Sequence, residues 1–345
     1  MKIKVAIVGA TGYAGAEIVR LLYNHPNAEV TAVSSVSFEG KQLSEVYPAY
    51  KGFCDKVCEN QSEVVDKADV VFAALPHGLS EALAKECDEK GKRFIDLGAD
   101  FRLECEEDYQ QWYEKSYDCP ELHSKSVYCI PELFRQNVNK DSIIANPGCY
   151  PTSISLGLYP ALEKGFVETE GIVIDSKSGV TGAGRGLSQT THYPDCNEAF
   201  SPYKVAQHRH TPEIEQSLSH AANEPLKVTF VPHLLPVNRG IVSTMYARLK
   251  SGVTEDEVFA AYNKKYENEP FVRVLKKGAV ANLKNVKYTN MCDISLHFDK
   301  RTNTLIVVST IDNMVKGAAG QAIQNMNLIF GLPETTGLDL VPPAF

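Results

Sequence analysis

The chain opens with a short apolar run that is followed by three glycines at intervals of three residues. Residues 5–8 read Val-Ala-Ile-Val, and Gly9, Gly12 and Gly15 lead into a segment with helical spacing of apolar residues. A strand, a glycine turn and a helix in this order are typical of a dinucleotide-binding α/β domain. Gly9 would permit the sharp turn, Gly12 would let the backbone approach a pyrophosphate, and Gly15 would allow close helix–strand packing. The spacing departs from G-x-G-x-x-G, so a tight turn in a flavodoxin-like domain is the alternative interpretation.

The first half of the chain alternates short apolar runs with segments of helical spacing. Two such segments, residues 12–23 and 79–91, separate runs that are rich in Val, Ile and Phe. Runs of this kind are typical of parallel strands buried on both faces. The pattern predicts an α/β fold with a doubly wound parallel sheet. The predicted strands are residues 5–8, 30–34, 70–75, 94–97 and 143–145.

From about Gly171 onward, β-branched residues alternate with polar ones. This change predicts an α+β second domain, with helices at residues 211–222 and 255–266. A polar turn at residues 299–303 indicates a hairpin between the last two strands. A final helix at residues 316–330 is expected to dock back on the first domain. The predicted strands of this half are residues 172–176, 227–231, 241–250, 293–298 and 304–309.

Length, charge and cysteine usage narrow the class of protein. A chain of 345 residues exceeds one typical core and suits two domains. The net charge of −8 and the lack of Lys–Arg blocks argue against a nucleic-acid-binding protein. No apolar run approaches the roughly 20 residues of a membrane span, and the N-terminus has no signal-peptide pattern. The nine cysteines have no disulfide-like framework, which indicates reduced thiols in a cytoplasmic protein.

One cysteine stands out by its position in the segment Asn146-Pro-Gly-Cys-Tyr-Pro-Thr152. The pattern places Cys149 on a tight turn between an apolar strand at residues 142–145 and a helix at residues 152–163. The amides and the positive dipole end of a helix favour a thiolate and can lower the pKa of cysteine from about 8.5. Most cysteines are inert buried thiols, but this one follows the carboxyl end of a strand, where open α/β sheets bind ligands. The position therefore predicts a nucleophile.

A thiol nucleophile needs a base, and the densest histidine cluster is His208-Arg209-His210. The cluster precedes Thr211-Pro-Glu213, which reads as a helix start with the threonine as its cap. Either histidine would be able to take a proton from Cys149 and later return it, although two solvated loop histidines are the alternative. A zinc site with His192 and Cys196 fits no common spacing, so no metal is predicted.

The residues after the second predicted strand indicate which nicotinamide cofactor binds. An NAD site usually carries Asp or Glu there, which bonds the ribose diol. Here the strand ends in Ser34-Ser35-Val36-Ser37, with Lys41 just beyond it. Small hydroxyls without a carboxylate suit a 2′-phosphate, so Ser35 and Ser37 are predicted to contact NADPH. Glu39 is the one nearby feature that favours NAD.

Three arginines are candidates to hold an anionic group of the substrate bidentately. Arg102 follows the fourth predicted strand, and Arg239 lies between two strands of the second half. Arg185 comes near the end of a glycine-rich stretch that begins with Ser178 and Gly179. That stretch is itself a candidate cover for the nicotinamide or the substrate anion. A surface salt bridge is the alternative for Arg102 and for Arg185.

Further motifs accompany the glycine turn and the Cys149 segment. They are Leu75-Pro-His-Gly78, Asp100-Phe-Arg102, Ser178-Gly-Val-Thr-Gly-Ala-Gly184, His208-Arg-His210, Pro232-His-Leu-Leu-Pro236 with Arg239-Gly240, and Lys316-Gly-Ala-Ala-Gly-Gln321. In this order they resemble the N-acetyl-γ-glutamyl-phosphate reductases of arginine biosynthesis, which are relatives of aspartate-semialdehyde dehydrogenase. The resemblance covers nearly the whole chain, and its Pro-Gly-Cys-Tyr-Pro-Thr segment is highly specific.

The resemblance implies a Rossmann domain at residues 1–148, with residues 316–345 returning to it. It also implies an α+β catalytic and oligomerisation domain at residues 149–315, NADP(H) as the cofactor, and a homodimer or homotetramer. In such an enzyme the nucleophile would be Cys149 and the acid–base residue His208, with the neighbouring His210 as the open alternative.

Both the motifs and the resemblance assign residues to a cofactor site and a substrate site. The expected substrate-binding residues are Arg102, Arg185, His210 and Arg239. The expected cofactor-binding residues are Gly9, Thr11, Gly12, Tyr13, Gly15, Ser35, Ser37, Pro76, Ser178, Gly179, Asn313 and Lys316.

The expected reaction combines thiol chemistry with this resemblance. The Cys149 thiolate would attack an acyl phosphate, phosphate would leave, and NADPH would reduce the resulting thioester to a semialdehyde. His208 would move the proton, and backbone amides near the helix start would stabilise the oxyanion. The expected partners are a small acyl-phosphate substrate and phosphate, with no nucleic acid and no membrane.

Three alternatives stay open at this point. Aspartate-semialdehyde dehydrogenase would use the same chemistry on a smaller substrate. The second alternative is the same reaction on a glutamyl substrate with a different acyl group, such as succinyl, or on an aminoadipyl homologue. A non-catalytic NADPH-sensing module would keep the glycine turn but would need no special cysteine.

Overall fold

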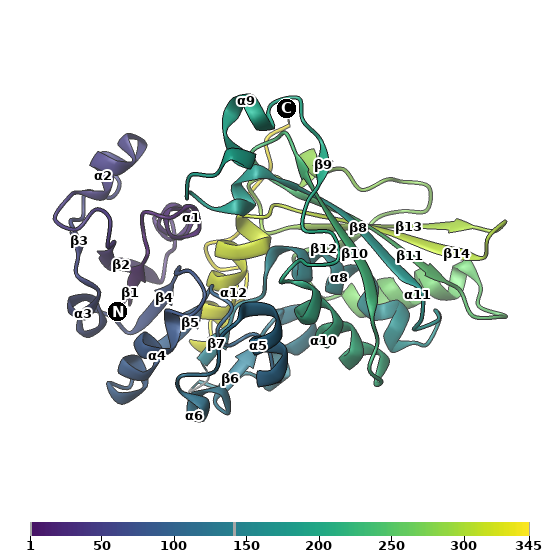
Figure 1. The fold of residues 1–345 in the computed structure, drawn as a ribbon, viewed down its shortest axis with the longest axis horizontal. Coiled ribbons are helices and arrows are strands. Elements are labelled where there is room, and N and C mark those ends of the chain that lie inside the picture. Colours follow the sequence, from purple (N-terminus) through teal and green to yellow (C-terminus); the bar gives the residue numbers. More distant parts are fainter. Residues whose placement is uncertain (1, 141–142, 345) are drawn as a thin grey trace. The chain divides into compact units, whose positions relative to one another are not determined.

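The computed structural model describes residues 2–140 and 143–344. The chain forms two compact units, and the ribbon in Figure 1 labels their helices and strands. The first unit contains residues 1–147 and 318–339, and the second unit contains residues 148–317 and 340–345. The chain therefore leaves the first unit, returns to it for one short segment, and ends in the second.

A seven-stranded sheet with parallel pairing throughout forms the centre of the first unit. The strand order β3-β2-β1-β4-β5-β7-β6 runs outward from β1 in both directions, as in a doubly wound fold. The inner strands are nearly all apolar and buried, because the sheet is covered on both faces. The strands are β1 (Ile3–Val8), β2 (Ala28–Ser34), β3 (Cys58–Glu59), β4 (Val70–Ala73), β5 (Arg93–Asp96), β6 (Ser126–Tyr128) and β7 (Ile143–Ala145).

The helices of the first unit bury an apolar stripe against this sheet. α1 contacts β1 and β2, and α4 contacts β4 and β5. α12, which comes late in the chain, packs against α1 and β5. Amide side chains fix it there: Asn327 Oδ1 lies 2.9 Å from His25 Nε2, and Asn325 Nδ2 donates to Asn146 Oδ1 at 3.1 Å. The helices are α1 (Tyr13–Leu22), α2 (Leu43–Val46), α3 (Gln61–Val64), α4 (Ser80–Glu89), α5 (Glu106–Tyr113), α6 (Pro120–His123), α7 (Pro131–Phe134) and α12 (Gly320–Ile329).

The second unit is built on a mixed sheet with the order β12-β13-β14-β11-β8-β10-β9. β8 pairs with β10, and β12 with β13, in parallel, whereas the other pairs are antiparallel. Along β8 and β11 buried residues alternate with more exposed ones, which is the pattern of a sheet with one covered face. The strands are β8 (Ile172–Gly179), β9 (Ser201–Pro202), β10 (Val228–Leu235), β11 (Ile241–Arg248), β12 (Val272–Val274), β13 (Cys292–Asp299) and β14 (Thr304–Ile311).

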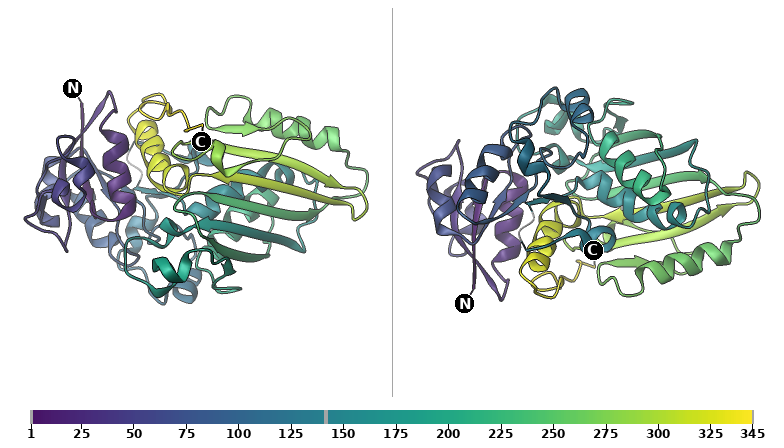
Figure 2. Two further views of the ribbon diagram at one scale, coloured as in Figure 1. Left: turned by 90° about the horizontal axis from the view of Figure 1, so that it is seen from above. Right: turned by 90° about the horizontal axis from the view of Figure 1, so that it is seen from below.

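Helices cover one face of this second sheet. α8 packs on β11 and β14, and α10 and α11 lie beside α8. The view from below has α8 and α10 in front of the strands, whereas the view from above has the strands in front (Figure 2). The helices are α8 (Cys149–Glu163), α9 (Tyr193–Cys196), α10 (Thr211–Ala222) and α11 (Glu255–Tyr266).

The predicted fold class, a doubly wound parallel sheet with an α+β partner, is confirmed. Each predicted strand is present with its ends shifted by a few residues, and the predicted hairpin joins β13 to β14. Ser142, with which the strand before Cys149 was expected to begin, lies outside the described residues. The pattern missed β3, β6, β9 and β12, because strands of two or three residues are too short to show periodicity.

Three helix boundaries differ from the expectation. α8 begins at Cys149 rather than at Thr152, because a proline in the first turn, here Pro151, does not delay a helix. Thr211 is not the cap of α10, since His210 occupies that position and already has helical backbone angles. The final helix begins with a π-helical turn at Val315–Ala319, and α12 follows it to Ile329.

Candidate active site

The glycine turn of the first unit leaves no room for a side chain at Gly9 or at Gly15. Gly9 has a φ of +83°, and a Cβ there would run into the backbone of Ala74. A Cβ on Gly15 would lie 2.7 Å from the Cα of Ala10. Gly12 is the N-cap of α1, and the following Tyr13 is 38% exposed. The turn therefore presents the amides of a helix start at an accessible surface, as a pyrophosphate site requires.

The loop after β2 is tied to the same turn. The hydroxyls of Thr11 and Ser35 lie 2.6 Å apart, and both residues are buried. Ser37 and Lys41 are exposed just beyond them. Glu39, the residue that favours NAD, lies 3.4 Å from the amide of Asn60 in a hydrogen bond between exposed side chains. Hydroxyls and an amine thus occupy the place where a carboxylate would bind a ribose diol, and these residues fit a 2′-phosphate.

Pro76 lies exposed in the loop after β4. It shares the carboxyl edge of the parallel sheet with the glycine turn and the β2 loop, because β4 pairs with β1 and β1 with β2. The cofactor-binding residues expected in the first unit therefore gather at one edge of one sheet.

In the second unit, Cys149 is the first residue of α8 and is partly exposed between buried neighbours. Helix geometry leaves the first-turn amides without an acceptor inside the helix, and this arrangement suits a developing negative charge. The amide of Gly148 donates to Glu213 Oε1 at 2.7 Å, so a buried carboxylate fixes the turn that precedes the thiol. Gly317 packs directly against Cys149, since a Cβ at position 317 would lie 2.7 Å from the Cβ of Cys149.

An aromatic cluster surrounds the expected acid–base residue. The ring of His208 lies 5.4 Å from Tyr150, 5.5 Å from Phe230 and 4.9 Å from His210, measured between ring centroids. Tyr203 connects the cluster, because its hydroxyl donates to the Tyr150 hydroxyl at 3.1 Å and lies 3.4 Å from His208 Nε2. The cluster places both candidate histidines beside the residue that follows Cys149.

His208 is held as a neutral ring. Burial, with the Lys204 and Arg209 cations adding to it, lowers the pKa of His208 to about 3. The backbone amide of His210 donates to His208 Nδ1 at 3.1 Å, which assigns the ring proton to Nε2. The resting ring therefore directs an N–H towards the hydroxyl of Tyr203 and does not form an imidazolium–thiolate pair.

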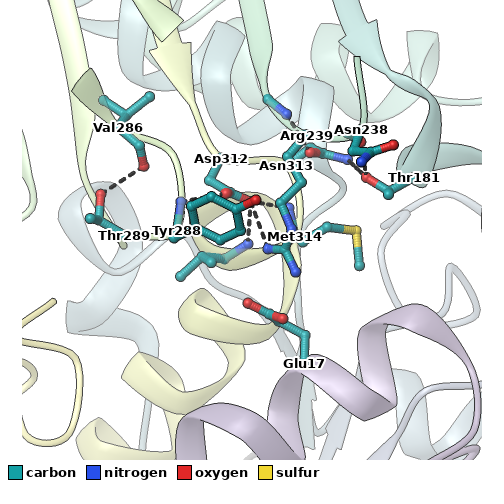
Figure 3. A network of polar contacts seen from close by, with 12 residues as sticks. Glu17, Thr181, Asn238, Arg239, Val286, Tyr288, Thr289, Asp312, Asn313 and Met314 are labelled. Atoms are coloured by element: carbon teal, nitrogen blue, oxygen red, sulfur yellow. Dashed lines mark hydrogen bonds and ion pairs between the residues drawn. The ribbon is translucent and has the colours of Figure 1, made fainter. Parts of the chain in front are cut away.

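Two other predicted residues of the second unit belong to a polar network around Asp312 (Figure 3). Arg239 lies 3.4 Å from the Asp312 carboxylate, and its guanidinium is 4.9 Å from the ring centroid of Tyr288. Asn313 accepts the amide of Gly240 at 2.6 Å and donates to the Thr181 hydroxyl at 3.0 Å. Both predicted side chains therefore also hold the loops of this unit together.

The remaining predicted residues differ in their surroundings. Arg102, in the first unit, donates to the carbonyls of Asn146 and Leu97 and is only 8% exposed. Arg185 is partly buried after an exposed glycine-rich turn. Ser178 and Gly179 are buried at the end of β8, where a Cβ on Gly179 would lie 2.8 Å from the Arg239 amide nitrogen. Lys316 is fully buried, with its ammonium 5.6 Å from the ring centroid of Phe271.

The other eight cysteines have different environments from that of Cys149. All nine lie within the described residues, and none forms a disulfide. Burial raises the pKa of Cys87 to about 12 and also raises the pKa values of Cys54 and Cys58. His192, from the zinc alternative, lies 3.1 Å from Asp195 in an exposed pair. Among the residues that the structure describes, no group of three or more His, Cys, Asp or Glu side chains could hold a metal ion.

Sequence reasoning missed several residues around the thiol. Tyr150 lies within the cysteine motif, so its position was available, but its ring contacts were not. Tyr203, Glu213 and Asp312 come from other segments and show no local signal of their own. Only the fold brings them together.

Within residues 2–140 and 143–344, no helix combines the length and the apolar character that a membrane crossing needs.

Known proteins resemble both units. Residues 4–141 match the semialdehyde dehydrogenase, NAD binding domain, and residues 149–313 match the semialdehyde dehydrogenase, dimerisation domain. Among solved structures, the fold is similar to that of aspartate semialdehyde dehydrogenase II from Vibrio cholerae, complexed with ASA. That comparison has a TM-score of 0.72 at 18% identity and covers 96% of this chain and 99% of the other. The NADP complex of aspartate semialdehyde dehydrogenase from Candida albicans has a TM-score of 0.67 at 17% identity, with 96% and 98% covered.

Sequence relatives are much closer than these structures. The chain is 56% identical to the N-acetyl-gamma-glutamyl-phosphate reductase of Brachyspira hyodysenteriae and 54% identical to that of Clostridium beijerinckii. Each comparison covers 99% of this chain and 100% of the relative. The resemblance expected from the motifs is therefore confirmed, and the chain belongs to the N-acetyl-gamma-glutamyl-phosphate reductase family of semialdehyde dehydrogenases.

Proposed function

We propose that this chain is an NADPH-dependent reductase that converts N-acetyl-L-glutamyl 5-phosphate to N-acetyl-L-glutamate 5-semialdehyde and phosphate, in arginine biosynthesis. The observation that carries this proposal is full-length identity of 56% and 54% to relatives of that name. The thiol at the start of α8 supports the same chemistry, because a thioester route needs an accessible cysteine beside amide donors.

The cofactor site is proposed at the carboxyl edge of the first sheet. Gly9, Gly12 and Gly15 would form the pyrophosphate turn with Thr11 and Tyr13. Ser37 would bind the 2′-phosphate together with Ser35, whose hydroxyl bonds that of Thr11. The loop after β4 would line the nicotinamide half of the cofactor. When bound, NADPH supplies the hydride. Ser35, Ser37 and Pro76 are further residues proposed for this site. The cofactor-binding residues proposed in the second unit are Ser178, Gly179, Asn313 and Lys316.

Cys149 is proposed as the nucleophile. Its thiolate attacks the acyl carbon, the bond to the phosphate oxygen breaks, and phosphate leaves with that electron pair. Amides of the first turn of α8 hydrogen bond to the oxyanion of the tetrahedral intermediate. The amide of Gly148 has a different role, because it donates to Glu213. Once the thioester carbon has received a hydride, the oxyanion re-forms the carbonyl, and the C–S bond breaks to return the thiolate.

His208 is proposed as the proton-transfer residue, with His210 as the alternative. Its neutral ring carries the Nε2 proton, so at rest it is a hydrogen-bond donor. A ring in this state can donate to the oxyanion, and it accepts a proton from the Cys149 thiol only after the tautomer changes. The proposed substrate-binding residues are Arg102, Arg185, His210 and Arg239.

The two units are proposed to act as an NADP-binding Rossmann domain and an α+β catalytic and oligomerisation domain. A homodimer or homotetramer would use the face of the second sheet opposite α8, where Val173 and Tyr246 are 38% and 36% exposed. Light scattering of the purified protein tests this assignment, since a concentration-independent monomer would contradict it. A cytoplasmic location stays a prediction from the cysteine usage.

The deciding experiment runs the reaction in reverse. N-acetylglutamate 5-semialdehyde should reduce NADP in a phosphate-dependent manner, and aspartate semialdehyde should not. Activity with aspartate semialdehyde alone would assign the chain to the chemistry of the related dehydrogenases. Activity with neither would contradict the proposed acyl group, and N-succinyl and aminoadipyl semialdehydes would then be the next substrates to compare.

A further inference from the structure

Asp312 is a fully buried carboxylate to which the proposed reaction gives no role. It directly follows Ile311, the last residue of β14. None of its surface is exposed. A buried carboxylate is costly unless several donors satisfy its oxygens. The donors around Asp312 therefore indicate what this residue holds in place.

Four donors from three segments converge on the carboxylate (Figure 3). Oδ1 accepts the backbone amides of Met314 at 2.8 Å and Val315 at 3.1 Å. It also lies 3.4 Å from Nη1 of Arg239. Oδ2 accepts the backbone amide of Tyr288 at 2.6 Å. One side chain thus connects the loop before β11, the loop before β13 and the turn after β14.

The turn after β14 is the one that contacts the proposed nucleophile. The carbonyl of Asp312 accepts the amide of Gly317 at 3.0 Å, which closes a five-residue turn of π-helical type. Such turns occur frequently at functional sites. Gly317 lies so close to Cys149 that an added Cβ would be 2.7 Å from the cysteine Cβ. Asp312 therefore bonds both ends of the turn that borders the thiol residue.

The next residue extends the same arrangement to the glycine-rich loop. Asn313 accepts the Gly240 amide and donates to the hydroxyl of Thr181, which itself donates to the carbonyl of Asn238 at 2.5 Å. Residues 312 and 313 thereby connect the turn after β14 to the loop before β11 and to the glycine-rich loop. An amide in place of the Asp312 carboxylate would turn an N–H group towards at least one of these donors.

We propose that Asp312 is a positioning residue for Cys149, which acts by holding the 314–317 turn against the first residue of α8. The inference rests on the proposed function only in taking Cys149 as the nucleophile. A displaced turn changes the surroundings of the thiol without removing any group that touches the substrate, and small misplacements of reacting groups can cost about a hundredfold in rate.

The test compares Asp312→Asn with the wild-type protein. The rate of Cys149 alkylation by iodoacetamide is measured from pH 5 to 10, with the modified peptide identified by mass spectrometry. We expect alkylation to slow about tenfold near neutral pH, with a shifted pH midpoint. We also expect kcat to fall about a hundredfold while the KM for NADPH changes less than about twofold. The alkylation profile reports on Asp312 even if the wild-type protein proves inactive with the proposed substrate.

Asp293→Asn is the matched control. Asp293 is a buried carboxylate of β13, and it lies 2.6 Å from Arg273 Nε rather than at the 314–317 turn. It should leave the alkylation profile of Cys149 unchanged. An equal shift in this control would assign the effect to general loosening and overturn the proposal.

A second variant keeps the test decisive if Asp312→Asn does not fold. Gly317→Ala pushes the same turn away from Cys149 and leaves the carboxylate in place. It should change the alkylation profile in the same direction. A wild-type profile in every folded variant at these two positions would show that the turn does not position the thiol.

Discussion

The proposed cofactor site of the first unit consists mainly of backbone amides, whereas the proposed thiol site of the second unit consists mainly of side chains. In the first unit, a seven-residue turn forms the site from backbone amides, and Gly9 and Gly15 are required there because side chains would collide with neighbouring backbone atoms. In the second unit, side chains from separate segments surround the thiol: Tyr150 comes from α8, Tyr203 and His208 from the segment before α10. Four donors meet on Asp312 in the same unit.

This difference determines how each part should respond to change. A backbone site depends on steric fit at a few positions and is insensitive to pH. A site of buried side chains depends on protonation states and on hydrogen bonds between distant segments. The predictions below test that contrast, from the largest expected effect to the smallest.

Cys149→Ser should abolish most turnover and leave NADPH binding intact, which is the largest effect expected here. The hydroxyl is a far weaker nucleophile than the thiolate, so kcat should fall at least about a thousandfold, or about 4 kcal/mol in the barrier. NADPH affinity, measured by fluorescence titration, should stay within about twofold because the glycine turn is unchanged. Loss of NADPH binding in this variant would mean that the thiol has a structural role and that the contrast is wrong.

The pH dependence of stability should run in opposite directions in the two units. Burial, with the neighbouring Asp100 adding to it, raises the pKa of Asp96 in the first unit from 3.8 to about 7. The native state then keeps a proton that the unfolded state releases, so this contribution is lost as the pH rises from about 4 to about 7. The pKa of His208 is lowered from 6.5 to about 3, so its contribution is present above 6.5 and is lost as the pH falls.

Thermal unfolding across pH 4 to 8 can resolve these two contributions. The single tryptophan, Trp112, lies in α5 and reports on the first unit by its fluorescence. Asp96→Asn should increase the free energy of unfolding of the first unit by on the order of 2–4 kcal/mol at pH 8 and should not increase it at pH 4. His208→Gln should weaken the acid-side loss of stability and leave the tryptophan signal unaltered. The same pH response in both variants would contradict the assignment of the groups to separate units.

Gly15→Ala should damage the first unit alone. The added Cβ would lie 2.7 Å from the Ala10 Cα, and backbone atoms cannot easily move, so we expect a cost of about 2 kcal/mol and weakened NADPH binding. The control is Gly91→Ala, where φ is +62° but no atom lies within 4 Å of the added Cβ. It should lose some stability from backbone strain and keep its NADPH affinity. Cys149 alkylation should be unchanged in both variants.

Ser37→Asp should produce the smallest effect and should act on cofactor choice. A carboxylate after β2 would repel a 2′-phosphate and bond a ribose diol, so the preference for NADPH over NADH should fall about tenfold, or about 1.4 kcal/mol. Ser124→Asp, an exposed serine of the same unit, adds the same charge elsewhere and should not change the preference. An unchanged ratio in Ser37→Asp would place the 2′-phosphate at another part of the loop.

The sequence predicted the parts of the site that are contiguous in the chain. The glycine turn and the Cys149 segment each carry their information within seven residues, and both are found where the strand pattern puts them. For His208 and His210 a solvated loop stayed the alternative to the predicted acid–base role, because the burial of His208 against Tyr150 and Phe230 is visible only in the folded chain. The neutral state of His208 follows from that burial, so sequence could not supply it either.

Long-range partners account for most of what sequence could not predict. Glu213 and Asp312 are acidic residues beside apolar ones, and nothing local distinguishes them from surface carboxylates. Their roles arise because α10 packs on α8 and because β14 ends beside the loop of Arg239. The start of α8 is different, since Pro151 gave a misleading signal: a proline marks many helix ends but is also accepted in a first turn.

The return of residues 318–339 to the first unit has a consequence for the order in which a ribosome completes the protein. The second unit is essentially continuous from residue 148 to residue 317, so nearly all of it is synthesised before α12. The first unit begins earlier but finishes later, because the helix that packs on α1 and β5 arrives last. Until then the partners that α12 supplies to His25 and Asn146 are missing. A chain released before residue 318 should thus contain a nearly complete second unit and an unfinished first unit, whose exposed apolar surface makes such a chain prone to aggregation.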